Sequence, residues 1–309
     1  MHKTQSFFAK LLVGLSISCL AYTTVQAAVY PMPQPGDDLV GQPFQIQVQK
    51  GDSTDQIRMR YEVSDAELKA ANPRIARGIL KVGDLVTIPT QYVLPQYRQG
   101  LVLNMAELKL YYFTPDGQYV YAFPVAMGRP NWRTPTMVSK IVRKQEDPTW
   151  YVPKAIQEYM FAKHGKLLPD IMPPGEENPL GDFALYLAKQ GYLIHGTNEQ
   201  QTVGTYASSG CMRLSMDAID TLYRNVAIGT QVHIIHHASK AGWLGNNLYL
   251  EVHSPLNDLR EEPNALNKAE VEDAIEGALQ FRSARINWDE VYKDEKQHDG
   301  MPHIIGTRA

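Results

Sequence analysis

The stretch YLIHGTNEQQTVGTYASSGCMRLS, residues 192–215, decides the interpretation of the whole chain. It contains Cys211, the one cysteine that follows residue 27, and His195 in a compact His-Gly-Thr setting upstream. Three interpretations are open: a nucleophile with its base, half of a metal site, or a buried thiol that happens to follow a histidine. Each of them makes different demands on the surrounding sequence.

Length and composition limit the choice. With 309 residues and 44% hydrophobic content, the chain can bury a sizeable core and is long enough for two domains. The formal net charge is −3, so the chain lacks the Lys/Arg excess that nucleic-acid-binding surfaces need. We therefore expect no nucleic-acid partner.

The first 27 residues predict a secretory signal peptide. Lys3 and Lys10 accompany an apolar run from Leu11 to Ala21, and small residues follow up to a cleavage site after Ala27. A membrane anchor is the alternative, but the run is much shorter than the roughly 20 residues that a span requires. We expect cleavage and no transmembrane segment in the mature chain.

Cysteine usage points to a reactive thiol. Cys19 lies inside the predicted signal peptide, and Ser16 stands where a lipid-attachment site normally has a leucine. Cleavage leaves Cys211 alone in an oxidising compartment, where cysteines usually pair as disulfides. Reactivity is the leading explanation for an exported, unpaired thiol.

Two segments precede the main part of the chain. Residues 28–43 are rich in Pro and Gly and predict an extended linker. Residues 44–90 predict a small α+β unit, with strands at 44–48 and 85–88 and two capped helices between them. The expected order is strand, helix, helix, strand.

This unit resembles a LysM module, the small βααβ fold that binds N-acetylglucosamine-containing glycans such as peptidoglycan. The matching pieces are Val48-Gln49-Lys50-Gly51-Asp52, Val63-Ser64, Glu67-Leu68, Ala71-Asn72-Pro73 and Gly83-Asp84-Leu85-Val86-Thr87-Ile88-Pro89. The pattern departs at Ser53-Thr54, where a Thr-Leu pair is more usual. The resemblance implies glycan binding that localises the chain without taking part in chemistry, and a spacer that binds nothing is the alternative.

Residues 98–237 predict a mainly β region. Residues 101–113 alternate in hydrophobicity, Pro115-Asp116-Gly117 predicts a turn, and residues 119–128 predict the returning strand of a hairpin. Residues 155–181 predict a long irregular segment. Connections of this length are usually functional, so we expect a lid over the site.

The opening stretch predicts a strand, a loop and a helix. His195 and Cys211 flank a loop at a strand end, where catalytic groups are often found. Ser215 can cap a following helix, after which residues 230–236 form a strand. The side chains that this helix is expected to bury are Ile219, Leu222 and Tyr223.

The metal interpretation is weak. Zinc sites need three or four ligands, and structural sites usually use two or more cysteines. The other candidates, His233, His236 and His237, are more simply a strand end with alternating side chains. We expect neither a metal nor a cofactor.

The inert-thiol interpretation conflicts with the neighbours of Cys211. Ser208-Ser209-Gly210 is small and flexible, which suits a core strand poorly. Its backbone N–H groups, that of Gly210 among them, can hold an oxyanion. A neighbouring imidazole such as His195 can take the thiol proton and hold a thiolate. These features favour the nucleophile with its base.

Residues from about 100 to 236 closely resemble the YkuD-type L,D-transpeptidase catalytic domain of bacteria. The family has His-Gly-Thr followed by Ser-His-Gly-Cys and Arg, and Ser209 stands here where many members have the second histidine. The matching residues are His195-Gly196-Thr197, Ser208, Gly210, Cys211 and Arg213, with Asn178-Pro179-Leu180-Gly181 and Ala184-Leu185-Tyr186-Leu187 before them.

The resemblance implies a β-sandwich catalytic domain and acyl transfer between peptidoglycan stem peptides. Cys211 would attack the bond between a diamino acid and the terminal D-alanine. His195 would take the thiol proton and return it to the leaving amine, and the carbonyl of Gly196 would orient the imidazole. The expected substrate-binding residues are Thr197, Ser208, Ser209 and Arg213.

The implied partners are peptidoglycan stem peptides and glycan, with an outer-membrane lipoprotein lysine as a further acyl acceptor. The implied location is a Gram-negative periplasm. Three other functions stay open: an L,D-carboxypeptidase with water as acceptor, a cell-wall-binding protein without activity, and, most remotely, a zinc peptidoglycan hydrolase.

Residues 238–309 predict a C-terminal extension of a hairpin, at 241–256, and a helix. Asn267-Lys268-Ala269-Glu270 can cap the helix. Its apolar face would contain Val271, Ile275, Leu279 and Ile286. We expect this face to pack on the catalytic domain, with a partner-binding helix as the alternative.

Overall fold

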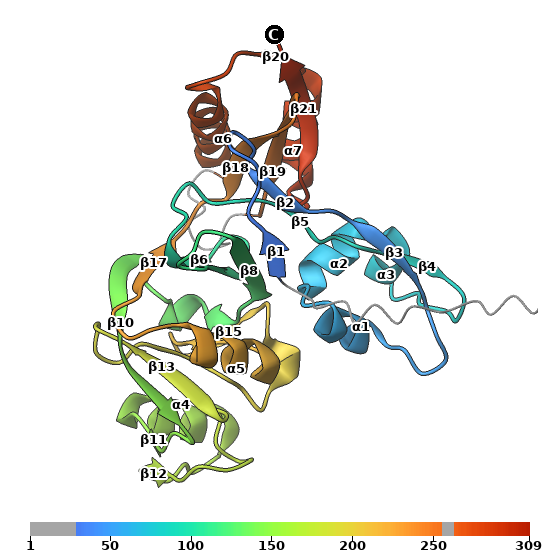
Figure 1. Ribbon diagram of the computed structural model, residues 1–309. Helices are drawn as coiled ribbons and strands as arrows, with labels where there is room; N and C mark the ends of the chain where they lie inside the picture. Colours follow the sequence, from blue (N-terminus) through green and yellow to red (C-terminus); the bar gives the residue numbers. More distant parts are fainter. Residues whose placement is uncertain (1–28, 255–262) are drawn as a thin grey trace, which may run out of the picture.

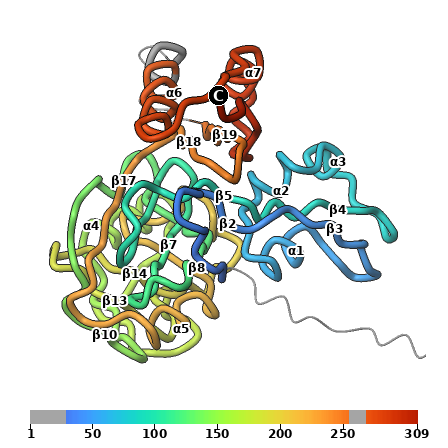
Figure 2. Tube along the Cα trace, turned by 45° about the horizontal axis from the view of Figure 1, so that its top comes forward, coloured from blue at the N-terminus to red at the C-terminus, as the bar shows by residue number. Residues whose placement is uncertain are grey.

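The computed structural model describes residues 29–254 and 263–309. Figures 1 and 2 show a large β-rich main part, a small helical unit beside it (blue to cyan) and a C-terminal part (orange to red). The predicted signal peptide, residues 1–27, lies outside the described residues. No helix in the described ranges is long and apolar enough to cross a membrane.

The main part is built on one nine-stranded sheet. The strand order is β1-β8-β7-β6-β17-β10-β13-β14-β16, and only the pairs β6–β17 and β14–β16 are parallel. The strands are β1 (Val29–Pro31), β8 (Tyr119–Pro124), β7 (Lys109–Phe113), β6 (Gly100–Asn104), β17 (Gln231–Ile235), β10 (Met137–Glu146), β13 (Phe183–Leu187), β14 (Leu193–His195) and β16 (Met212–Arg213). The prediction of a mainly β architecture is confirmed.

Strand β10 takes the sheet around a corner. Residues 137–140 pair with β17, and residues 141–146 pair with β13, with a register shift between Ile141 and Arg143. A shift of this kind bends a strand, so the two halves of the sheet curl around a shared core. The predicted sandwich is therefore one curled sheet and not two separate sheets.

The core draws on both halves of the sheet and on helix α5 (Met216–Asn225). Leu103 of β6, Ile194 of β14 and Ile219 of α5 are all fully buried in one cluster. Ser215 Oγ accepts a hydrogen bond from the Ala218 N–H at 3.1 Å, so the predicted helix cap is confirmed.

One predicted strand is in fact two. The chain reverses between Asn104 and Lys109, so residues 101–113 form β6 and β7. Leu108 has a φ of +50° in this reversal. The turn contains neither Gly nor Pro, and the usual sequence signal for a turn is therefore missing. The predicted hairpin of β7 and β8 is confirmed.

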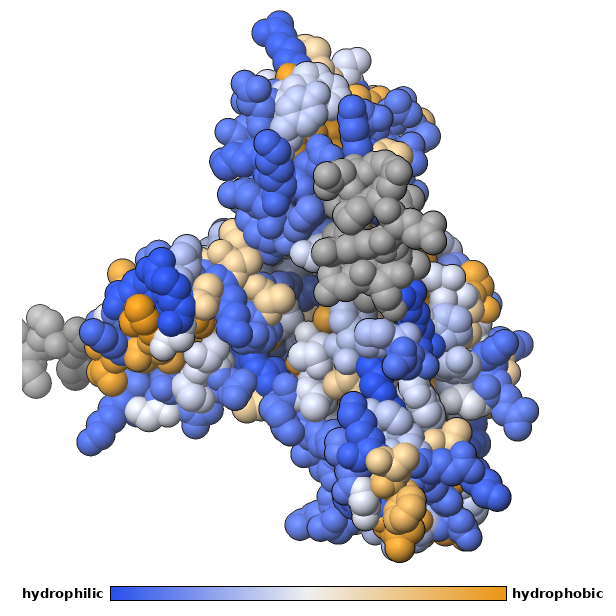
Figure 3. All heavy atoms as spheres, turned by 180° about the vertical axis from the view of Figure 1, so that it is seen from behind, coloured by the Kyte–Doolittle hydropathy of each residue, from blue (hydrophilic) through white to orange (hydrophobic). Residues whose placement is uncertain are grey.

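The segment 155–181 was predicted to be irregular throughout, but its first part is ordered into a helix and a short strand. Helix α4 (Lys154–His164) lies between β11 (Trp150–Tyr151) and β12 (Ile171–Met172), which pair with each other. Gly165 ends the helix with a φ of +64°, a conformation that favours glycine. No residue of α4 is buried. Figure 3 shows apolar side chains at the bottom of the main part, the end that contains α4, β11 and β12 in Figure 1. The exposed ones include Phe161, Leu167 and Ile171.

The residues expected to form a linker belong to the fold. Strand β1 pairs with β8 at the sheet edge, and β2 (Leu39–Gly41) pairs with β5 (Gln91–Val93). The elements between them are β3 (Phe44–Gln47), α1 (Thr54–Arg60), α2 (Asp65–Ala71), α3 (Pro73–Ala76) and β4 (Leu85–Ile88). The predicted order of this small unit is present with α3 added, and both capping boxes form, at Ser53 and Ser64.

The C-terminal part has its own core. The predicted hairpin, β18 (Ser239–Leu244) and β19 (Asn247–Val252), joins β21 (His303–Arg308) and β20 (Ala284–Ile286) in a four-stranded sheet. The helices are α6 (Pro263–Leu279) and α7 (Trp288–Gln297). Val271 and Ile275 pack against this sheet, so the prediction that they pack on the catalytic domain was wrong. Ile286 lies on β20 and not on the helix.

Candidate active site

Strands β14 and β16 bring His195 and Cys211 to one face of the sheet. The strands pair in parallel, with Ile194 opposite Met212 and His195 opposite Arg213. Ile194 and Met212 are buried in the core, and side chains alternate along a strand. His195, Arg213 and Cys211 therefore share the other face. Cys211 is the diagonal neighbour of His195, a relationship that separates the two residues by about 7–8 Å.

The backbone of the next residue holds the His195 ring. Nδ1 lies 2.6 Å from the carbonyl oxygen of Gly196, so Nδ1 carries the proton and Nε2 is the free basic nitrogen. A side chain at position 196 would disturb this contact, because a Cβ there would lie 2.7 Å from Met216 Sδ and 3.1 Å from Ile219 Cγ2. The contact that the family resemblance implied for Gly196 is present.

The environment keeps His195 neutral. The residue is 3% exposed. Burial, and then the Arg213 guanidinium, lower the pKa of the imidazole to about 3, although hydrogen bonds to the Gly196 and Leu180 carbonyls oppose this. A neutral imidazole is the form that can accept a proton.

The Cys211 thiol is partly enclosed. Its Sγ donates to the carbonyl of Gly191 at 3.7 Å. Burial raises the pKa of the thiol, while the Leu193 N–H and the Arg213 guanidinium lower it. The resting pair is therefore a neutral thiol and a neutral imidazole, and not the thiolate that was expected. The thiol bonds Gly191 in this arrangement, so its proton must leave this carbonyl before it can pass to His195.

Hydrogen bonds fix the turn before Cys211. Ser208 Oγ donates to the carbonyl of Cys211 at 2.5 Å and accepts from the Gly210 N–H at 3.1 Å. Thr134 Oγ1 donates to the carbonyl of Gly210 at 2.9 Å. Gly210 itself has a φ of +106°, which favours glycine. The Gly210 N–H would have to leave Ser208 before it could donate to an oxyanion.

Two predicted substrate-binding residues are buried supports instead. Ser208 is 1% exposed, and Thr197 is fully buried with its Oγ1 accepting from the Glu199 N–H at 3.0 Å. Each uses its hydroxyl to bond a backbone group of the loop. Ser209 is half-buried beside Cys211. Arg213 pairs with Glu199 at 2.7 Å and stays next to the reacting pair.

Asn178 supports the site in a way that the sequence did not suggest. It is 1% exposed, and its Nδ2 donates to the carbonyls of Pro148, Met172 and Pro173. Its Oδ1 accepts from the Leu180 N–H at 3.0 Å, and the carbonyl of Leu180 bonds the His195 ring. Asn178 therefore links His195 to the two ends of the segment that contains α4, at Pro148 and at Met172-Pro173.

A pocket of about 440 Å³ lies near the turn but does not contain the reacting pair. Its lining includes Met127, Thr134, Tyr206 and His236, and neither Cys211 nor His195. We assign it no part in the chemistry, because bond formation requires atoms within reach of the sulfur.

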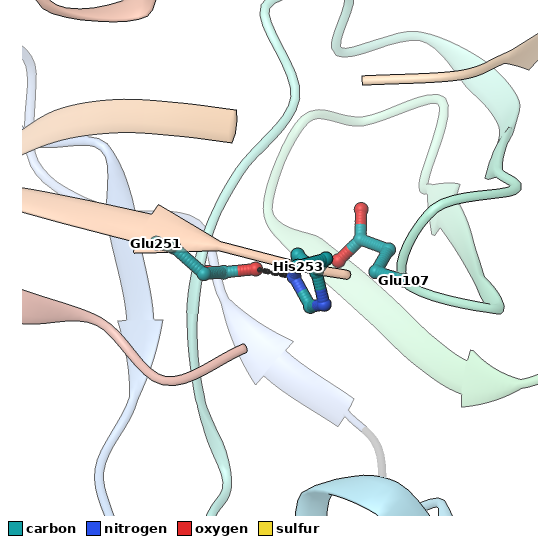
Figure 4. Close-up of side chains that lie close together, drawn as sticks. All are labelled: Glu107, Glu251 and His253. Atoms are coloured by element: carbon teal, nitrogen blue, oxygen red, sulfur yellow. Dashed lines mark hydrogen bonds and ion pairs between the residues drawn. The ribbon is translucent and has the colours of Figure 1, made fainter. Parts of the chain in front are cut away.

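A group of candidate metal ligands lies between the main part and the C-terminal part. Glu107, Glu251 and His253 offer ligand atoms within 4.8 Å of one another (Figure 4). The Lys240 ammonium lies 2.8 Å from a carboxylate oxygen of each glutamate. Burial raises the pKa of Glu251, but Lys240 and His253 outweigh it and hold the pKa at about 2. Because Lys240 already supplies the positive charge, these residues fit an internal ion-pair network and not a metal centre.

Similarity to known proteins assigns the family. The profile of YkuD, the L,D-transpeptidase catalytic domain, matches residues 98–234. The probable L,D-transpeptidase ErfK/SrfK of Escherichia coli K12 is 38% identical over 259 residues, covering 82% of this chain and 82% of that protein. The chain belongs to the L,D-transpeptidase family.

Other L,D-transpeptidases extend the comparison. The probable L,D-transpeptidase YcfS of Escherichia coli K12 is 34% identical over 293 residues, covering 92% of this chain and 87% of that protein. The catalytic domain of the Enterococcus faecium L,D-transpeptidase aligns with a TM-score of 0.35 and 18% identity, over 46% of this chain and 100% of that one. The family assignment rests on the sequence relatives and not on this structural score.

Proposed function

We propose that the chain is a peptidoglycan L,D-transpeptidase that works through a thioester on Cys211. One observation carries the proposal: His195 and Cys211 share the outer face of β14–β16, with Nδ1 of the histidine held by Gly196. The names of the relatives support the same reaction class.

The reaction begins with the neutral pair. As Sγ of Cys211 attacks the carbonyl carbon between the diamino acid and D-alanine, its proton passes to Nε2 of His195. The carbon–nitrogen bond then breaks, and the imidazolium returns the proton to the leaving amine of D-alanine. An acceptor amine attacks the thioester next and loses its proton to His195. The carbon–sulfur bond breaks, and His195 passes the proton to the sulfur, which restores the thiol. The acceptor is a second stem peptide or a lipoprotein lysine, and water in its place gives the carboxypeptidase reaction.

Arg213 assists this chemistry electrostatically. Its guanidinium stands opposite His195 and lowers the pKa values of both reacting groups. The charge therefore favours the thiolate that forms during attack and disfavours a permanently protonated histidine. The segment with α4 would cover the thioester and exclude water, since Asn178 joins its base to the histidine.

Acylation by a carbapenem tests the function. Between about pH 5 and 8 neither group of the pair should titrate, because the pKa of His195 is about 3 and that of the thiol is raised. We expect one adduct per chain by intact mass, with a rate that is flat across this window. D-alanine release from a muropeptide tetrapeptide should have the same profile. A wild-type chain that forms no adduct would refute the proposal.

Two arginine variants test the role of the Arg213 charge, with Arg213→Gln as the test variant and Arg224→Gln as its matched control. In Arg213→Gln the pKa of His195 should rise toward its ordinary value, so the acid limb of the rate profile moves toward neutral pH. Arg224→Gln removes an exposed arginine that pairs with Asp220 on α5, and it should leave the profile unchanged.

We also propose that residues 44–90 form a LysM-like module that binds peptidoglycan glycan, and that the chain acts in the periplasm. The sequence matches and the strand, helices, strand order support this. Removing the module should reduce co-sedimentation with insoluble peptidoglycan. Equal co-sedimentation by the full chain and the shortened chain would make the module a spacer.

A further inference from the structure

The small unit, residues 44–88, is docked on the loop that joins His195 to Cys211. Arg58 of α1 is 4% exposed and points into this loop. Its Nη2 donates to the carbonyl of Gln201 at 2.9 Å, and its Nη1 donates to the carbonyl of Val203 at 3.3 Å. Its Nε donates to Asp55 at 2.8 Å, which fixes the direction of the guanidinium. One buried fork therefore holds two carbonyls of the loop.

The loop also approaches the small unit as closely as its backbone allows. Gly204 has a φ of +77°, and a Cβ there would lie 2.9 Å from Cβ of Ser64. Only glycine fits such an approach without strain. Ser64 is the buried cap of α2, so the loop rests on the end of this helix.

A second set of contacts lies on the other side of Cys211. Glu62 accepts a hydrogen bond from Ser215 Oγ at 2.9 Å, and Ser215 caps α5 directly after the catalytic strand. The buried Glu67 carboxylate lies 2.9 Å from the buried ammonium of Lys109 on β7. The small unit therefore contacts the catalytic segment both before and after the nucleophile.

A short series of contacts connects Arg58 to His195 and Cys211, by way of the turn at 200–202 and Arg213. Gln201 is the middle residue of a 3-10 turn, Gln200–Thr202, which directly follows Glu199. Glu199 pairs with Arg213 at 2.7 Å, and Arg213 lowers the pKa values of His195 and Cys211. The position of this turn therefore sets where the Arg213 charge lies relative to the pair.

We infer that Arg58 is a positioning residue for acyl transfer, so the small unit takes part in setting the geometry of the active site as well as in localisation. The inference rests on the proposed function for the identity of nucleophile and base. This inference differs from the expectation that the unit supplies localisation alone, and the experiment below decides between the two.

The test compares Arg58→Ala with Arg58→Lys and with Arg60→Ala in the full chain. Arg60 is the matched control, because it lies on the same helix but its side chain is 51% exposed and pairs with Asp52. We expect the acylation rate of Arg58→Ala to fall by about ten- to a hundredfold, since a small misplacement of reacting groups has effects of this size. Arg58→Lys keeps the charge without the fork and should lie between, and Arg60→Ala should match wild type.

Three further readouts separate positioning from simple loss of folding. The final extent of acylation should stay at one adduct per chain, and kcat should fall while KM is unchanged. Hydrogen exchange of the amides at 199–206 should accelerate, and this readout does not depend on catalysis. A final extent that falls in proportion to the rate would overturn the inference, because it indicates a smaller folded fraction.

Wild-type rate and wild-type exchange in Arg58→Ala would also overturn the inference while leaving the Cys211 mechanism intact. A wild-type chain that is never acylated would refute the proposed function instead. Faster exchange in Arg58→Ala would in that case still support the docking of the small unit on the loop.

Discussion

Replacing Cys211 with alanine is expected to abolish carbapenem adducts and to lower D-alanine release by more than about 10⁴-fold. In the proposed mechanism the sulfur forms the covalent intermediate, and no other thiol is present among the described residues. The fold should survive, because Cys211 is only partly buried and its thiol interacts only with backbone groups, the carbonyl of Gly191 and the N–H of Leu193. Intact mass and chromatography of released D-alanine measure the loss, and a thermal melt checks the fold.

Cys211→Ser tests whether the site needs the acidity of a thiol. A serine hydroxyl loses its proton far less readily than a thiol, so this variant should be nearly inactive although it keeps the shape of the site. Thr221→Ala is the matched control, since it removes a hydroxyl of α5 that bonds the carbonyl of Asp217 and leaves the sulfur in place. Turnover in Cys211→Ala close to that of wild type would reject the thioester mechanism.

Replacing Lys240 with methionine is expected to lower the free energy of unfolding by about 3–5 kcal/mol at neutral pH. The ammonium donates to the carbonyl of Val93 at 2.6 Å and to carboxylate oxygens of Glu107 and Glu251, each at 2.8 Å. Both carboxylates are buried, so methionine would fill the space of the lysine and leave two negative charges without their cation. Chemical denaturation of the two proteins measures the difference.

The ion pairs of Lys240 with Glu107 and Glu251 also predict which second substitution restores stability. Adding Glu251→Gln to Lys240→Met removes one of the unpaired charges and should restore part of the lost stability. Lys293→Met is the matched control, because the side chain of Lys293 is 55% exposed and water screens its pair with Glu290. A change of less than about 1 kcal/mol in Lys240→Met would show that the network does not stabilise the junction of the two parts.

Patterns that act over a few residues predicted much of the secondary structure. The Ser53 and Ser64 capping boxes, the Ser215 cap and the hairpin of β7 and β8 all follow from neighbours within four or five positions. Helix α4 was not predicted, because it buries none of its residues and its sequence therefore lacks the periodic apolar positions that indicate a helix. The chain reversal at 105–108 was not predicted, because its residues are not the ones that usually form turns.

The reacting pair was predictable for a related reason. A cysteine that is predicted to be exported and unpaired, and that follows a His-Gly-Thr sequence, is unusual in itself, so residue types alone selected Cys211 and His195. Their supports were less visible. Ser208 and Thr197 look like substrate contacts in the sequence, and only their burial shows that their hydroxyls hold the loop.

By itself, then, the sequence determined the order of the small unit and most hairpins and singled out the proposed nucleophile and base, because each depends on chemistry or periodicity within a short window. The tertiary structure decided the pairing of β1 with β8, the contact of Arg58 with the catalytic loop and the burial of Lys240 between two glutamates. These features join residues up to 145 positions apart, as Arg58 and Val203 are. A hydrogen-bond donor in the sequence does not specify its distant acceptor. The partner is selected when the apolar cores of the three parts pack and bury the polar groups that must then be paired.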